Sequence, residues 1–133
     1  KLLSGYFQIT PTAGYSFDTL FTFKAEEWRD QSNKHTREPM KYSISYSVKS
    51  DAGEQREYSL VMENNLTAED VPDDIPKYSS EDSFKFPMLS QKEITIEVVF
   101  TIKDRYNAPK QISKSIVLSP RKEGDETPML TIF

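Results

Sequence analysis

Large apolar residues alternate strictly with small or polar ones in two stretches of the chain, residues 42–48 and residues 94–102. The first stretch reads Tyr-Ser-Ile-Ser-Tyr-Ser-Val and the second reads Ile-Thr-Ile-Glu-Val-Val-Phe-Thr-Ile. A period of two places one set of side chains on a buried face and the other on a solvated face, as in a half-exposed antiparallel sheet. A helix would spread the same apolar residues around its circumference. Both stretches are therefore predicted to be β-strands.

The rest of the pattern predicts further short strands and no amphipathic helix. The expected strands are residues 2–9, 17–25, 41–48, 55–62, 84–89, 94–103 and 111–118. A short turn that carries Gly53 predicts a hairpin between the third and fourth of them. Pro87 interrupts the fifth and predicts an edge position for it. Residues 63–82, which are rich in acidic residues, Ser, Asn and Pro, are expected to form a long irregular loop.

These elements predict an all-β fold of about seven strands, a two-sheet antiparallel sandwich with an immunoglobulin-like or fibronectin type III-like topology. Residues 1–119 are expected to form the sandwich module, and residues 120–133 a linker or edge segment that leads to a following module. The expected core consists of Trp28, Phe21, Phe23, Tyr42, Ile44, Tyr46, Ile96, Val98 and Phe100. Trp28 is interpreted as a core anchor, with an exposed ligand-stacking ring as the alternative.

Some apolar residues fall on the faces that the alternation assigns to solvent. They are Leu20, Val61 and Val99. They mark either the place where a neighbouring domain or partner docks, or the ordinary scatter of apolar residues over a protein surface.

Composition and charge narrow the classes of function. A chain of 133 residues with 12% aromatic residues fits one domain that folds without metal or disulfides. It contains no Cys, which excludes disulfides and thiolate chemistry. The formal net charge is −4 and the basic residues are scattered, so we expect no nucleic-acid binding. The apolar runs are too short to cross a bilayer, so we expect no membrane insertion by this segment.

Candidate chemistry is sparse. His35, the only histidine, lies in a polar stretch without a partner for a catalytic triad or a zinc site, so no enzyme and no cofactor are expected. The calcium candidates are Asp70, Asp73, Asp74 and Asp82 of the predicted loop. Calcium takes about six to eight oxygen ligands, but these residues lack EF-hand spacing, and a solvated loop is the commoner meaning of such a run. Asn65-Leu66-Thr67 is an N-glycosylation sequon.

Residues 7–30 resemble the opening of the receptor-for-egg-jelly (REJ) module of polycystin-type membrane proteins. The matching residues are Pro11, Gly14, Thr19, Phe21, Trp28 and Asp30. Pro39-Met40-Lys41-Tyr42 is similar to the segment that follows in the family. Residues 94–104 and 112–118 are similar to the last hairpin of that module and of the related polycystic-kidney-disease repeats.

The resemblance implies a non-catalytic structural or adhesion module of a larger extracellular or membrane-anchored protein at the cell surface. Such a module would space and present neighbouring domains and would contact them, and other proteins, through the loops at 29–39 and 63–82. Phe7 and Ala25 occupy the positions of the family's cystine, and a large residue facing a small one would fill that cross-sheet gap by packing. The alternative is a soluble carbohydrate-binding or calcium-dependent accessory module.

Overall fold

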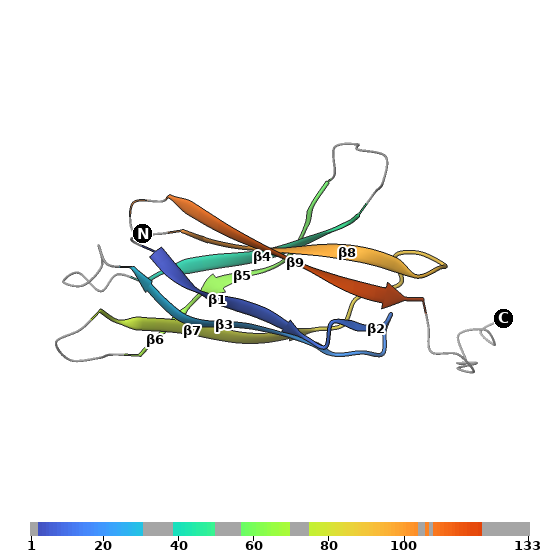
Figure 1. Cartoon of the computed structure of the whole chain (residues 1–133), viewed down its shortest axis with the longest axis horizontal. Helices are drawn as coiled ribbons and strands as arrows, with labels where there is room; N and C mark the ends of the chain where they lie inside the picture. Colours follow the sequence, from blue (N-terminus) through green and yellow to red (C-terminus); the bar gives the residue numbers. More distant parts are fainter. Residues whose placement is uncertain are drawn as a thin grey trace.

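Nine strands in two sheets make up the part of the chain that the computed structural model describes, which is residues 3–30, 39–49, 57–69, 75–103, 106 and 108–120. The strands are β1 (Leu3–Thr10), β2 (Ala13–Tyr15), β3 (Phe21–Asp30), β4 (Lys41–Val48), β5 (Ser59–Asn65), β6 (Thr67–Glu69), β7 (Lys77–Phe84), β8 (Ile94–Lys103) and β9 (Pro109–Ser119). One sheet has the order β1–β3–β7–β6 and the other has the order β2–β9–β8–β4–β5. Figure 1 shows them as two facing layers. The predicted all-β class is confirmed.

The hydrophobic core lies between the two sheets and is built from the apolar phase of each alternating strand. On β8 the inward residues Ile96, Val98, Phe100 and Ile102 are all fully buried. Among the residues expected in the core, Trp28, Phe21, Phe23, Tyr42, Ile44, Ile96, Val98 and Phe100 are buried, and Tyr46 is partly buried and packs against them. The two alternating stretches thus supply one wall of the core as β4 and β8.

Trp28 lies against Gly5 where the pairing of β1 and β3 is irregular. The register of this pair shifts between Ser4 and Tyr6. The indole Nε1 donates a hydrogen bond of 2.9 Å to the Tyr6 carbonyl oxygen. A Cβ on Gly5 would lie 2.5 Å from Trp28 Cγ, so only glycine leaves room for the indole. The ring also packs against Phe100 of the facing sheet, with the centroids 5.5 Å apart.

The predicted strand at 17–25 is wrong at both ends, because β3 begins at Phe21 and continues to Asp30. Phe17 has a φ of 66°, which lies in the left-handed region and not in the extended region of a regular strand residue. Its backbone N–H donates to the Phe86 carbonyl oxygen at 2.8 Å instead of to a strand ladder. The chain therefore turns before it enters the sheet, and Trp28 belongs to the strand rather than following it.

The predicted loop at 63–82 is also wrong. The described part of this range contains the end of β5, all of β6 and most of β7, while residues 70–74 lie outside the described residues. The less exposed face of β7 carries Tyr78, Ser80 and Asp82, so its period of two is present but is carried largely by polar side chains. A search for apolar alternation overlooks such a strand.

The predicted edge strand at 84–89 is not formed, because β7 ends at Phe84 and the next strand begins at Ile94. β7 itself lies between β3 and β6, so it is not an edge strand. The predicted hairpin between the third and fourth strands is confirmed, since β4 and β5 pair antiparallel from Lys41 with Asn65 to Tyr46 with Ser59. The turn at Gly53 lies outside the described residues.

The sheets contain one parallel pair, whereas an all-antiparallel arrangement was predicted. β2 runs parallel to the end of β9, and Tyr15 is the register partner of Ser119. Val117 N–H donates to the Thr12 carbonyl oxygen at 3.0 Å, and Ser16 N–H donates to the Ser119 carbonyl oxygen at 2.8 Å. The expected strands omit β7, and they also omit this short strand and the short β6, because three residues are too few for a periodic signal.

The first described strand begins and the last one ends at opposite ends of the molecule (Figure 1). The Lys110 ammonium, near the start of β9, donates a hydrogen bond of 3.3 Å to the Leu3 carbonyl oxygen at the start of β1. Ser119, at the other end of β9, pairs with β2. The nine residue steps from Lys110 to Ser119 span about 30 Å in a β-strand, so β9 connects the two ends.

We predict that Gly5→Ala destabilises the protein, because the new methyl group would enter the space of the Trp28 indole. Overpacking of this kind costs about 1–3 kcal/mol, more than the entropy gained by removing a glycine. Urea unfolding followed by the fluorescence of the single tryptophan measures the change. Ser4→Ala, at the exposed neighbouring position, is the matched control. Equal unfolding midpoints for the two variants would show that the indole does not require this glycine.

Candidate functional site

The residues that match the receptor-for-egg-jelly module hold the scaffold together. A Cβ on Gly14 would lie 2.6 Å from Thr19 Cβ, and Thr19 Oγ1 accepts a hydrogen bond of 2.8 Å from Tyr15 N–H. Phe21, Trp28 and Asp30 are fully buried. These residues define turns and core contacts, so a surface for ligands or partners has to be found elsewhere on the molecule.

Phe7 and Ala25, at the family's cystine positions, lie in the same sheet and not across the two sheets as predicted. They are register partners on the neighbouring strands β1 and β3, and both are buried. The Phe7 ring stacks on Phe100 of the facing sheet, with the centroids 4.7 Å apart. A large side chain beside a small one therefore fills this position, and the larger one connects the two layers.

A polar contact crosses from one sheet to the other beside the core. The Tyr42 hydroxyl on β4 donates a hydrogen bond to the Asp82 carboxylate on β7. Burial, and then the hydrogen bond and the negative charge of Asp82, raise the pKa of Tyr42 to about 12, while hydrogen bonds with Ser80 and Asn64 act in the opposite direction. The neutral phenol is thus the form that the folded protein favours.

The remaining chemical candidates are only partly described. Asp82 accepts the hydrogen bond from Tyr42, and Asp70, Asp73 and Asp74 lie outside the described residues, as does His35. Within the described ranges, no group of three or more His, Cys, Asp or Glu residues is arranged to hold a metal ion. No helix in this part of the chain is long and apolar enough to span a membrane.

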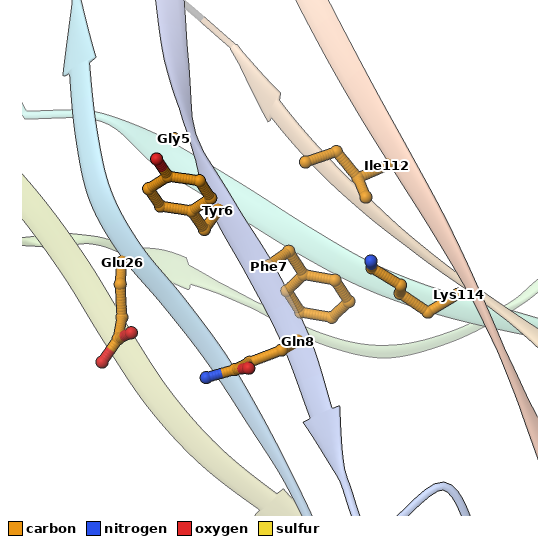
Figure 2. Close-up of a pocket in the computed structure, with 7 residues that line it drawn as sticks. All are labelled: Gly5, Tyr6, Phe7, Gln8, Glu26, Ile112 and Lys114. Carbon is orange, nitrogen blue, oxygen red and sulfur yellow. The ribbon is translucent and has the colours of Figure 1, made fainter.

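A groove of about 420 Å³ follows β1 along the side where the edges of the two sheets meet. Its lining comprises Gly5, Tyr6, Phe7 and Gln8 of β1, Glu26 of β3, and Ile112 and Lys114 of β9. Figure 2 shows Tyr6 and Glu26 on one side of the β1 ribbon and Ile112 and Lys114 on the other. A phenol, an amide, a carboxylate and an ammonium group beside apolar surface suit recognition of an amphipathic partner.

A second hollow, of about 350 Å³, lies on the outer face of the five-stranded sheet. Ser45, Tyr58, Glu97, Val99, Thr101, Gln111 and Ser113 line it. The Tyr58 hydroxyl donates to Glu97 Oε1 at 2.7 Å, and Gln111 Nε2 donates to Thr101 Oγ1 at 3.2 Å. This surface is rich in hydroxyl groups and is bordered by one exposed aromatic ring.

The predicted contact loops do not coincide with these surfaces. The loop at 29–39 is largely outside the described residues, and much of 63–82 is strand. The groove residues were missed because they lie on strands, although two of them carried a signal. Tyr6 is an aromatic residue in the polar phase of β1, and Lys114 interrupts the apolar phase of β9 between Ile112 and Ile116.

The apolar residues assigned to solvated faces divide into two groups. Leu20 is 52% exposed, whereas Val99 is buried at 9% and Val61 is half-buried against the core. Only Leu20 is thus a candidate for docking. Asn65 of the sequon is exposed at the end of β5, where the chain crosses to the other sheet and Leu66 is buried.

Comparisons with known proteins identify a family. The model of the REJ domain matches residues 2–132. A comparison with curated proteins found no match. Among solved structures, the crystal structure of Spo0M, a sporulation control protein from Bacillus subtilis, is similar with a TM-score of 0.49 and 10% sequence identity. The alignment covers 91% of this chain and 51% of that one, so the chain spans about half the length of Spo0M.

We predict that stability falls between about pH 10 and 12 and that Tyr42 causes part of the fall. A tyrosine in the unfolded chain ionises near its ordinary pKa of about 10, and the folded pKa is about 12. The contribution of a raised pKa is fully present below the unfolded value and is lost as pH rises through the folded one. Urea midpoints measured from pH 8 to pH 12 should fall less steeply in Tyr42→Phe.

The matched control for this prediction is Tyr6→Phe, at an exposed tyrosine. It should keep the alkaline dependence of the unmodified chain. Tyr42→Phe should also unfold more easily at pH 8, because the Asp82 carboxylate loses its donor. Parallel pH curves for the unmodified chain and Tyr42→Phe would contradict the assignment.

Proposed function

Because this chain belongs to the REJ domain family, we propose that it is a non-catalytic structural module of a larger extracellular or membrane-anchored protein. Its role is to hold neighbouring modules at a set distance and orientation and to present them to partners. Contacts with adjacent domains and other proteins would use the groove along β1. The resemblance to polycystin-type membrane proteins supports a place at the cell surface.

We infer that the topology is immunoglobulin-like. The strand orders support this inference, since β1–β3–β7–β6 and β9–β8–β4–β5 correspond to the A-B-E-D and G-F-C-C′ sheets of that fold. The short β2 is then an additional strand that joins the second sheet beside β9. A fold of this kind is a rigid two-layer body whose loops gather at its two ends, which suits a spacer.

The observation that carries the proposal is the separation of the two ends of the described chain. β1 begins beside Lys110 and β9 finishes at Ser119, with the length of β9 between them (Figure 1). Modules arranged in line need an entry and an exit at opposite ends. A module whose ends lay side by side would instead branch off the main axis.

We predict that removing residues 1–120 from a longer segment of the parent protein, with both neighbouring modules kept, shortens the segment by about 30 Å. Small-angle X-ray scattering measures the maximum dimension of the two segments. Replacing the module by a flexible linker with the same average end-to-end distance should broaden the distribution of distances between the neighbouring modules. The mean distance between them should change less than it does after the deletion. An unchanged maximum dimension after the deletion would mean that the module does not lie in line.

A secreted chain should carry a glycan on Asn65, which is exposed. We predict that the chain expressed through the secretory pathway of a eukaryotic cell gains the mass of one N-glycan, removable by a glycosidase. Thr67→Ala should abolish the modification, whereas Thr67→Ser should preserve it, because either hydroxyl completes the sequon. Mass spectrometry of the intact chain makes the comparison. An unmodified secreted chain would contradict the assignment of Asn65.

The alternative function is a soluble carbohydrate-binding or calcium-dependent accessory module. The hollow that Tyr58 borders favours the first form, since hydroxyl groups beside an aromatic ring can bind a sugar. Binding on a glycan panel, or a melting temperature that rises in millimolar calcium, would favour this alternative over the spacer.

A further inference from the structure

Three large apolar side chains are exposed together in the connection between β2 and β3. Tyr15 is 38% exposed, Phe17 50% and Leu20 52%. They lie within six residues of one another, and we call this surface the β2–β3 corner. Grouped exposed apolar residues of this kind mark contact surfaces more often than isolated ones do.

The backbone of the β2–β3 corner is held in place by hydrogen bonds while these side chains stay partly exposed. Phe17 adopts a φ of 66°, which is rare and strained for a bulky residue, and its N–H donates to the Phe86 carbonyl oxygen at 2.8 Å. Thr19 N–H donates to the Tyr15 carbonyl oxygen at 3.1 Å. Strain that is fixed by surrounding hydrogen bonds points to a functional role for the conformation.

The chain leaves the sandwich at this same corner. Tyr15 is the register partner of Ser119, and the Ser119 carbonyl oxygen accepts hydrogen bonds from Ser16 N–H at 2.8 Å and Ser16 Oγ at 3.1 Å. Residues 121–133 follow, and thirteen residues can span roughly 45 Å when extended. They are therefore long enough to return to the surface beside which they start.

The composition of the last five residues complements the corner. They read Met-Leu-Thr-Ile-Phe, with one polar residue among four apolar ones. The family match continues to residue 132, well beyond the end of β9, which supports a tail that belongs to the module. Burying apolar side chains on both sides is the driving force for such a contact.

We propose that Met129–Phe133 binds the β2–β3 corner of the same molecule and covers Tyr15, Phe17 and Leu20. This contact would return the chain to the body of the module after it leaves β9. It would thereby set the direction in which any following segment continues. The proposal goes beyond the spacing role and can fail without affecting it.

A cross-linking experiment on the whole chain tests the proposal, because the chain contains no cysteine of its own. Asp18→Cys places a thiol in the corner without removing an apolar residue, and Thr131→Cys places one at the polar position of the tail. The control pair is Glu93→Cys with Thr131→Cys. Glu93 is exposed and also borders the exit, since Ser119 Oγ donates to its carboxylate at 3.5 Å.

We expect the corner pair to form its intramolecular disulfide at least about tenfold faster than the control pair, because docking raises the effective concentration of the two thiols. Adding Leu130→Asp and Ile132→Asp to the corner pair keeps the tether and both thiols but removes the apolar contact. The rate should then fall to that of the control pair.

Three outcomes would overturn the proposal. Equal rates for the corner and control pairs would mean that the tail reaches both sites by random motion. A corner rate that is unchanged by the two aspartates would exclude an apolar contact. Disulfide-linked dimers whose rate of formation rises with protein concentration would assign the corner to a second copy of the chain.

Discussion

The contact of the Trp28 indole with Gly5 is the constraint on which the rest of the structure depends. The ring fits only because Gly5 has no side chain, its nitrogen donates to the Tyr6 carbonyl oxygen, and its face meets Phe100 of the other sheet. One side chain thus sets the irregular register of β1 on β3 and the packing of one layer on the other. The Phe7 ring stacks on the same Phe100, so both strands of the pair contact one residue of β8.

The scaffold could be predicted from the sequence wherever the core side of a strand is apolar, as in β4 and β8. Prediction failed where the core side of a strand is polar, as in β7. The Asp82 side chain of β7 accepts a hydrogen bond from the Tyr42 hydroxyl of the other sheet, and a hydropathy pattern contains no signal for this contact. It also failed at Phe17, whose apolar character indicated a strand while its backbone turns. The groove along β1 could not be predicted because its lining combines Tyr6 of β1 with Lys114 of β9, which are more than a hundred residues apart in the sequence.

The residues that carry the family resemblance are structural residues of the scaffold. Gly14, Thr19 and Trp28 match the family, and each is explained by a turn or a core contact. Such residues identify the architecture, and they say little about partners. The candidate contact surfaces lie beside them and are the groove along β1, the hydroxyl-rich hollow and the β2–β3 corner. This division explains why fold and family followed from sequence while the contact surfaces needed coordinates.

The edges of the two sheets limit how a partner can use the groove. Among the described strands, β1 is paired on one side only and β2 covers only the last residues of β9, so both β1 and β9 have backbone groups that no described strand pairs with. The open part of β9, however, carries Pro109, Lys110 and Lys114, and proline and lysine are what proteins place on edges to prevent another strand from adding. The Lys110 ammonium also binds the Leu3 carbonyl oxygen of β1. Pairing with a partner strand is therefore hindered along β9, and β1 is the edge of this groove that keeps its backbone groups open.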